Sequence, residues 1–535
     1  MTRTNAYVSD ITYQVTFFEE QTPAHLGFAC LLGGCEPVAL DKPFTYMELG
    51  CGQGLTSNVL AATHPHARFF ACDFNPAHVA SARELAEAAN LDNIVFLEES
   101  FEQLAAGKVD DLPQFDFITM YGVYSWVDAD NRRHIADFIK RYLKPGGIVY
   151  ANYNAMPGWS AASVLQRLSW QHVELHPEGS AAQIDQMRAF VQQLHDVGPR
   201  FFSTTAGLSR FMDSFSESSK NYLAHEYLNR GWSALYHADV ARDMAGAKLD
   251  YAASAQMICN VPELHLTPEQ QRFLETIAHG PLRETARDCI LNASLRQDIF
   301  VRGARSVSAT RLAMWMSKVG LALACPYLPG DMTLQAAEGF DKLHAPVLEA
   351  LTKRPHRLSD LASLPPFAGQ PTAVLLKAAA KLISSGAAAP YFVQAAATDP
   401  APAHRLNMEL ARRSETSDEY QVLASPLLGG ATVAGLFQRL VYAFVAKQGK
   451  DVDAELISRH IADVVAAQRA SSVRNSQANE GATYRHEEIL STVQAILAHR
   501  LPIWVQHGTV GGCKPMVCGK TAGAHPQNAE LCVME

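Results

Sequence analysis

The chain has 535 residues, which is room for about three or four domains of the usual ~100–200 residues each. Hydrophobic residues make up 48% of the chain and charged residues 19%, a composition typical of a globular protein and not of a disordered one. The formal net charge is −9, and phosphate binding needs a clustered basic surface, so we expect no nucleic-acid partner.

Export and metal binding are not indicated either. No run of about 18 apolar residues occurs, so we expect no membrane span. The first residues are polar and lack the apolar stretch of a signal peptide. The ten cysteines form neither a CxxC pair nor a Cys/His group with zinc-finger spacing, so we predict no metal site. These patterns favour a cytoplasmic location with reduced thiols.

Short apolar runs alternate with amphipathic stretches in the first third of the chain. The runs that predict buried strands are 44–49, 68–72, 93–97, 115–120 and 147–153. Helical spacing of apolar residues between them, for example over 130–143, predicts intervening helices. Because strand–helix–strand alternation produces a parallel sheet with helices on both faces, we predict a doubly wound, Rossmann-like α/β domain over residues 1–160.

The pattern changes after about residue 158. Residues 161–330 show helical periodicity and predict a helical domain. Three short helical patterns and a possible strand pair between 335 and 395 have the order of a winged helix, so we predict a winged-helix-like C-terminal domain over 335–505. Residues 506–535 contain Gly and Cys without periodicity and predict a disordered tail.

A glycine-rich loop follows the first predicted strand. Residues 48–54 read Glu-Leu-Gly-Cys-Gly-Gln-Gly, directly before a predicted helix. Glycines permit a tight turn and let a ligand approach the backbone at the positive end of the helix. The dinucleotide fingerprint GxGxxG would need glycine at position 55, which is Leu55. The loop instead resembles motif I, ExGxGxG, of class I methyltransferases that use S-adenosylmethionine.

The next strands end in residues that fit the same cofactor. Asp73 lies 19 residues after Gly54, where a carboxylate can accept hydrogen bonds from both ribose hydroxyls. Tyr121 follows the fourth strand, over the reacting end of such a cofactor. The residues predicted to bind the cofactor are Glu48, Gly50, Cys51, Gly52, Gly54, Asp73, Phe74, Ser100, Phe101 and Tyr121. Glycines at βα turns and acids at strand ends occur in many parallel α/β proteins, so the prediction depends on their combination.

Longer segments carry a closer resemblance. They are Val-Tyr-Ser-Trp-Val at 123–127, Tyr-Asn-Ala-Met-Pro-Gly-Trp at 153–159, Tyr-Leu-Ala-His-Glu-Tyr-Leu at 222–228 and Arg-Gln-Asp-Ile-Phe-Val-Arg-Gly at 296–303. With residues 16–23, they resemble the bacterial methyltransferase family that has a methyltransferase regulatory domain and includes rickettsial protein lysine methyltransferases. The resemblance spans about residues 10–310. It implies a helical regulatory domain, a following winged helix and a homodimer.

Aromatic residues follow the fourth and fifth strands, at the edge where ligands bind in such sheets. We predict that Tyr121, Tyr124, Trp126 and Tyr153 are catalytic, and that the last three line a channel for the acceptor. Aromatic faces can hold a lysine stem or an ammonium group. The alternative is that Trp126 and Trp159 pack the helical domain onto the sheet.

The sequence therefore predicts an S-adenosylmethionine-dependent methyltransferase whose partner is a protein with accessible lysines. Two alternatives stay open, namely a small-molecule or lipid-linked acceptor and a cofactor-sensing regulatory protein on the same fold. The pair His225-Glu226 resembles the start of the zinc-protease motif HExxH, but the second histidine would be residue 229, which is Asn229. We favour a core or capping role for that segment.

Overall fold

The computed structural model describes residues 15–176, 180–205, 231–327, 343–393, 399–474 and 484–511. Between 206 and 230 it describes only residues 208, 212, 215, 223 and 226–229.

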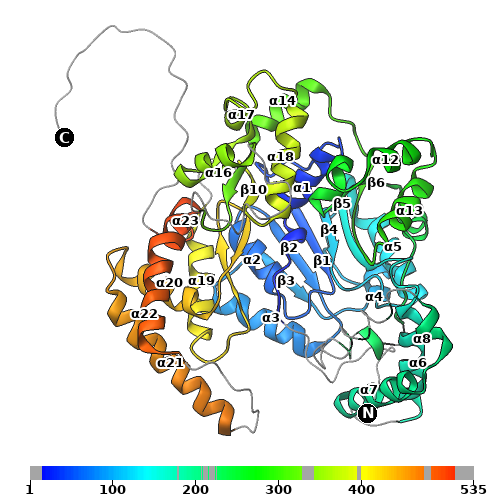
Figure 1. Cartoon of the computed structure of the whole chain (residues 1–535). Helices are drawn as coiled ribbons and strands as arrows, with labels where there is room; N and C mark the ends of the chain where they lie inside the picture. Colours follow the sequence, from blue (N-terminus) through cyan, green and yellow to red (C-terminus); the bar gives the residue numbers. More distant parts are fainter. Residues whose placement is uncertain are drawn as a thin grey trace.

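A seven-stranded sheet lies at the centre of the molecule (Figure 1), with the strand order β3-β2-β1-β4-β5-β7-β6. The strands are β1 (Thr45–Leu49), β2 (Arg68–Cys72), β3 (Ile94–Leu97), β4 (Phe115–Met120), β5 (Leu143–Asn154), β6 (Leu249–Ser254) and β7 (Leu295–Arg302). Strands β1 to β5 are parallel, and β7 runs antiparallel to both β5 and β6. All five predicted strands are present, which confirms the Rossmann-like α/β fold.

Helices cover both faces of the sheet because its strands are apolar on both sides. In β2, Phe69 and Ala71 point to the face that carries α1 (Pro23–Leu32), α2 (Leu55–Thr63) and α3 (Pro76–Ala88). Phe70 and Cys72 point to the opposite face, which carries α4 (Phe101–Ala106), α5 (Ala129–Tyr142) and α11 (His237–Gly246). Successive side chains of a strand alternate between faces, so one apolar run supplies both layers of the core.

Strands β6 and β7 correct the prediction of a purely helical segment over 161–330. They complete the sheet of the predicted first domain, and β7 pairs with β5 from Ile148↔Val301 to Asn154↔Leu295. The apolar run of β7 is only three residues long, at 299–301, because its first half contains Arg296, Gln297 and Asp298, all of them buried. Apart from the strand β8 (Val319–Leu323), the other described elements of this segment are helical: α6 (Ala162–Glu174), α7 (Ser180–Asp196), α8 (Arg200–Thr204), η3 (Met257–Asn260), η4 (Pro262–Leu264), α12 (Pro268–Glu275), α13 (Gly280–Leu291) and α14 (Ala309–Lys318).

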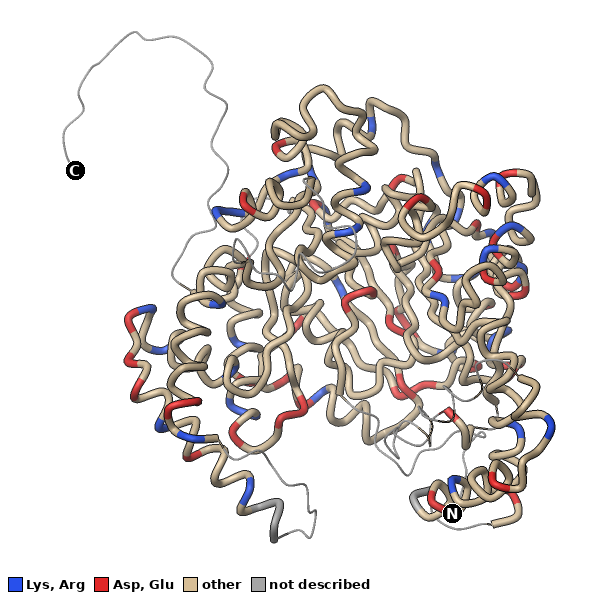
Figure 2. The backbone as a smooth tube through the Cα atoms, viewed as in Figure 1, with Lys and Arg blue, Asp and Glu red and all other residues tan. Residues whose placement is uncertain are grey.

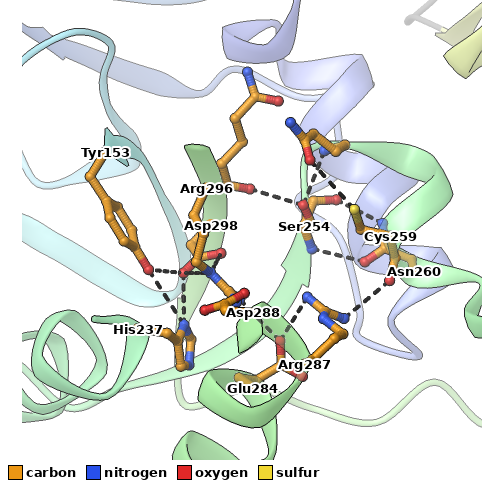
Figure 3. Close-up of polar contacts among 12 residues, drawn as sticks. Tyr153, His237, Ser254, Cys259, Asn260, Glu284, Arg287, Asp288, Arg296 and Asp298 are labelled. Carbon is orange, nitrogen blue, oxygen red and sulfur yellow. Dashed lines mark hydrogen bonds and ion pairs between the residues drawn. The ribbon is translucent and has the colours of Figure 1, made fainter. Parts of the chain in front are cut away.

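Arg296 is the centre of a buried ionic cluster (Figure 3). Its Nε donates to both carboxylate oxygens of Asp298, at 3.0 and 3.1 Å, and its Nη1 donates to Asp288 Oδ1 at 2.6 Å. Its Nη2 donates to Glu284 Oε2 at 3.0 Å. Burial alone would raise the pKa of Asp298, but the Arg296 charge and the hydrogen bond from His237 outweigh it and hold that pKa below its usual value. The cluster joins β7 to α11 and α13.

The segment after β7 contains a second, smaller sheet. Its elements are β8 (Val319–Leu323), α16 (His344–Lys353), β9 (His356–Arg357), α17 (Leu358–Leu361), α18 (Thr372–Ser384) and β10 (Ala388–Phe392). The three strands are antiparallel in the order β10-β8-β9. The three predicted helices are present, whereas the predicted strand pair at 387–393 is the single strand β10, which pairs with β8. The winged-helix assignment stays a prediction.

The last described elements form a helical unit beside the sheet (Figure 1). They are α19 (Ala401–Arg413), β11 (Val422–Ser425), β12 (Gly430–Val433), α20 (Leu436–Gln448), α21 (Ala454–Arg474), α22 (His486–Ala495), η5 (Ile496–Arg500) and α23 (Leu501–Gln506). Leu406 and Leu410 of α19 pack against Val59 of α2 and Leu85 of α3. Residues 507–510 fall in the predicted tail but are at least partly buried. Residues 512–535 of the predicted tail lie outside the described residues.

Basic and acidic residues are interspersed over the described elements (Figure 2). Among the described helices, none is long and apolar enough to cross a membrane.

Candidate functional site

A cavity of about 120 Å³ opens at the carboxyl ends of the parallel strands. The loops that line it follow β1 to β4 and are completed by the segment before α11. The lining residues are Gly50, Cys72, Asp73, Phe74, Glu99, Ser100, Phe101, Gly122, Val123, Trp126, Val127, Asp128, Asn131, Asn229 and Gly231. This is the edge of the sheet at which the sequence predicted a site. Of the predicted residues, the cavity brings together Gly50, Asp73, Phe74, Ser100, Phe101 and Trp126.

The glycine loop requires its glycines for two reasons. Gly50, Gly52 and Gly54 have φ of 74°, 53° and 71°, in the left-handed region that glycine adopts without strain. A Cβ on Gly50 would lie 2.5 Å from Val123 Cγ2, whereas nothing lies within 4 Å of the Cβ position of Gly52. The loop is therefore closely packed against Val123 at Gly50 and open at Gly52.

The three glycines differ in how much space surrounds them, which gives a test. A Cβ on Gly54 would lie 2.6 Å from Ala82 Cβ and 2.8 Å from Phe96 Cε1. We expect Gly54→Ala to destabilise the protein by ~1–3 kcal/mol more than Gly52→Ala, because both substitutions strain the backbone but only the first overpacks the core. Thermal unfolding of the two variants checks this, and equal melting temperatures would contradict it.

Asp73 connects the end of β2 to the glycine loop. Its Oδ2 accepts a hydrogen bond from Gly52 N at 2.9 Å, and its Oδ1 accepts from Asn75 N at 2.9 Å and contacts His78 Nδ1 at 3.3 Å. A carboxylate offers about four acceptor positions, so Oδ2 keeps one for a ligand hydroxyl in the cavity. Asp73 can therefore hold the loop and a ribose at once.

The third strand supplies a polar and an aromatic group. Ser100 is the N-cap of α4, and its side chain accepts from Gln103 N at 3.2 Å. Its hydroxyl hydrogen remains available as a donor. Phe101 begins α4, and Phe74, 39% exposed, lies on the neighbouring loop of the same cavity. Two aromatic faces and a hydroxyl in one cavity fit an adenine ring.

Glu48 and Cys51 support the loop from behind and do not line the cavity. Glu48 is buried, and its carboxyl accepts hydrogen bonds from Ser57 Oγ and, at 2.9 Å, from Gln21 Nε2. Burial raises the pKa of Glu48 to about 7. Loss of solvation, with the charges of Glu48 and Asp73, raises the pKa of the Cys51 thiol well above its usual value, which disfavours a nucleophilic role.

Tyr121 follows β4 but packs beside the cavity. Its ring stacks on Phe18, with centroids 3.6 Å apart and planes at 15°. Phe18 N donates to Thr56 Oγ1 at 3.2 Å, so the N-terminal segment rests on the start of α2, just after the glycine loop. Tyr121 thus joins this segment to the β4 end of the site.

Tyr124 and Tyr153 do not line the cavity, which differs from the prediction that they form a channel with Trp126. Both side chains are fully buried. The Tyr124 hydroxyl donates to Asp243 Oδ2 at 3.0 Å, and the Tyr153 hydroxyl donates to Asp298 Oδ2 at 2.6 Å (Figure 3). Both rings belong to the core between the sheet and the layer of α5 and α11.

The sequence reasoning missed the contribution of the segment before α11. Asn229 donates to Trp126 O at 2.7 Å and accepts from Gly231 N at 3.1 Å, which fixes the segment on the loop after β4. A Cβ on Gly231 would lie 3.0 Å from Asp128 N, so a larger residue would have to push the two segments slightly apart. The resemblance at 222–228 marked the neighbourhood, but no local pattern placed Asn229 at the cavity.

Known proteins agree with this geometry. Residues 47–149 match the family described as a methyltransferase domain, and residues 219–302 match the one described as a predicted methyltransferase regulatory domain. The fold and the matched domain define a class I methyltransferase. An uncharacterized protein of Synechocystis sp. is 31% identical over 518 residues, which cover 95% of this chain and 100% of that protein. A second uncharacterized protein, from Rickettsia prowazekii, is 25% identical over 274 residues, 50% of this chain and 47% of that one.

The chain therefore belongs to the family of methyltransferases that carry a methyltransferase regulatory domain, and its cofactor is S-adenosylmethionine. Among solved structures, PKMT2 from Rickettsia typhi, in complex with AdoHcy, is similar with a TM-score of 0.65 and 17% identity. The match covers 92% of this chain and 99% of PKMT2. At that identity the similarity establishes the fold. These findings confirm the predicted family and cofactor.

Proposed function

We propose that the protein methylates lysine side chains of another protein, and that the cavity at the carboxyl ends of β1 to β4 is where transfer takes place. The observation that supports the proposal most directly is that Asp73 and Trp126 line one cavity. Because β4 lies beside β1 in the sheet, the cofactor half over β1 to β3 adjoins the half over β4 that contains Trp126.

The cofactor supplies a methyl group on a sulfonium, which has a good leaving group. The protein's task is then positioning and the exclusion of water. Gly50, Asp73, Phe74, Ser100 and Phe101 are the residues we propose to hold the cofactor. We propose that Glu48, Cys51, Gly52 and Gly54 shape the loop, and that Tyr121 positions the N-terminal segment.

A lysine acceptor sets a further requirement, because its amine must be neutral to react. An unperturbed lysine has a pKa of about 10.4, so about one molecule in a thousand is neutral near pH 7.4. Aromatic and apolar walls disfavour the ammonium and can reduce this handicap of roughly 4 kcal/mol. Trp126 is half-buried at the cavity and supplies such a wall.

Trp126→Ala is expected to abolish most methyl transfer while leaving cofactor affinity within about threefold of wild type, because the indole lies over β4 and not over the adenosine half. Incubation with labelled cofactor and cell lysate measures transfer, and mass spectrometry of the labelled protein identifies the residue. Trp170→Ala, on α6 and away from the cavity, is the matched control.

The same experiment separates the alternatives. Label in the small-molecule or lipid fraction would show that the acceptor is a small or lipid-linked molecule and not a protein. Cofactor binding without any turnover would favour a regulatory protein. A homodimer and a cytoplasmic location are also proposals, and the homodimer is what the family resemblance implies.

A further inference from the structure

The carboxyl group of Glu226 is buried beside three of the chain's six tryptophans. Glu226 is only 7% exposed. Oε2 accepts hydrogen bonds from Asn154 Nδ2 at 3.1 Å and from Trp232 Nε1 at 3.0 Å. Trp232 in turn packs on Trp159, with ring centroids 4.9 Å apart. Trp126 packs on the same aromatic cluster.

Among the described residues, no cation is paired with this carboxyl group. Its donors are Asn154, Trp232 and Trp126, all neutral. Burial raises the pKa of Glu226 to about 7, although these three donors favour the ionised form. Asp298, by contrast, is also buried but has Arg296 beside it. A buried carboxylate that lacks a cation is costly, and next to a cavity it marks a candidate functional group.

The charged groups on neighbouring elements have other partners. Arg132 of α5 donates to Val127 O at 2.6 Å and to Ser233 Oγ at 3.2 Å. Asp128 caps α5 through Asn131 N at 2.9 Å. His225 and Arg230 lie outside the described residues.

The position of Glu226 connects it to the cavity. Trp126 lines the cavity, and its indole is a hydrogen-bond donor to the Glu226 carboxyl group. Asn229 and Gly231, which closely follow Glu226 in the sequence, also line the cavity. Asn154 is the last residue of β5. The carboxyl group therefore lies beside Trp126 on the β4 side of the cavity, away from the adenosine half over β2 and β3.

We propose that Glu226 is the counter-ion and proton acceptor for the ammonium group of the methyl acceptor. This inference rests on the proposed function and names the group that prepares its acceptor. Aromatic faces and a carboxylate together attract an ammonium group. Once both charges are out of water, transfer of one proton removes both, which burial favours.

The step moves a single proton. The N–H bond of the ammonium breaks, the O–H bond of Glu226 forms, and nitrogen keeps the electron pair that it needs to act as a nucleophile. The proton leaves Glu226 to water after turnover.

The first test measures binding and needs no turnover. The probes are lysine capped at both backbone ends and capped norleucine, its neutral counterpart, titrated by tryptophan fluorescence into protein saturated with S-adenosylhomocysteine. We expect wild type to prefer the lysine probe by about tenfold at pH 8 and less at pH 6, because the carboxyl group is ionised above its pKa while lysine stays charged. Glu226→Gln should remove this preference and leave S-adenosylhomocysteine affinity unchanged. Glu174→Gln, an exposed site on α6, is the matched control.

Two results would overturn the inference. One is a Glu226→Gln variant that retains the lysine preference with the same pH dependence. The other is a wild-type protein without that preference, which decides the question even if the variant does not fold. The acceptor-labelling experiment does not depend on either result. It therefore distinguishes a failure of the proposed lysine transfer from a failure of the proposed role of Glu226. If labelling identifies lysine, the rate limb that rises near pH 7 should be present in wild type and absent in Glu226→Gln.

Discussion

Replacing Asp73 by alanine is expected to weaken S-adenosylmethionine binding by about 100-fold or more, since hydrogen bonds to a charged group contribute ~1.5–3 kcal/mol each. Asp73 offers the ligand one acceptor position on Oδ2 and also holds Gly52 N at 2.9 Å. The substitution therefore removes a ligand contact and the restraint that keeps the loop open at Gly52. Calorimetric titration with S-adenosylhomocysteine, the unreactive product, measures the change.

Asp92→Ala is the matched control, because Asp92 is an exposed acid just before β3. We expect its affinity to stay within about twofold of wild type. Asp73→Asn keeps one oxygen that can accept from Asn75 N, so it serves as the folded reference if the alanine variant melts early. A folded Asp73→Ala protein with wild-type affinity would place the ribose elsewhere in the cavity.

The sequence was sufficient for the part of the fold whose signals are local. The strands β1 to β5 are apolar on both faces or end at a turn signal, and the glycine loop has a spacing that excludes the dinucleotide class at Leu55. Asp73 and Phe101 could be predicted because they lie shortly after the ends of β2 and β3. These residues line the cavity because the carboxyl ends of parallel strands meet at one edge.

Strand β7 was missed because its stabilising contacts are distant in sequence. Asp298 contacts His237, 61 residues away, and Tyr153, 145 residues away. In the sequence, each of these residues is a polar residue far from the others. Only folding brings the Asp298 carboxylate together with the side chains that hydrogen-bond to it. Hydrophobic periodicity cannot detect a strand that is buried through such pairs.

The two tyrosines show a different limit. Tyr153 shares its face of β5 with Val149 and Ala151, so strict alternation along the strand would have placed it in the core. That signal was present and was outweighed by its position near the strand end. Glu226 offered no such signal: its sequence neighbours resemble a failed zinc motif, and its relation to Trp126 exists only in three dimensions.

Replacing Arg296 by methionine is expected to cost ~3–5 kcal/mol of stability at neutral pH, because it leaves Asp288 and Asp298 in the interior without their cation. Glu284, the third partner, keeps an ion pair with Arg287 Nη2 at 2.7 Å. Arg296 is 4% exposed and pairs with Asp298, Asp288 and Glu284 at 3.0 Å or less. Methionine fills a similar volume, so the loss reports the charge and not a cavity. Hydrogen exchange of the β7 amides localises the effect to the sheet that carries the site.

The stability loss of Arg296→Met should depend on pH. Even with Arg296 present, burial raises the pKa of Asp288 to about 6. Without Arg296, we expect the folded-state pKa of Asp288 to lie further above the unfolded value, so Asp288 favours folding only when protonated, and stability falls as the pH rises. We therefore expect the deficit of Arg296→Met to be smaller at pH 5 than at pH 7.5.

Arg242→Met is the control for the same substitution at an exposed pair, since Arg242 and Asp239 are 73% and 45% exposed in their side chains. Its expected cost is below ~1 kcal/mol at either pH, because solvent screens exposed pairs. If Arg296→Met behaved like Arg242→Met, the cluster would contribute no more than a surface ion pair. The polar half of β7 would then need another reason to be buried, and the link from α11 and α13 to the sheet would depend on apolar packing alone.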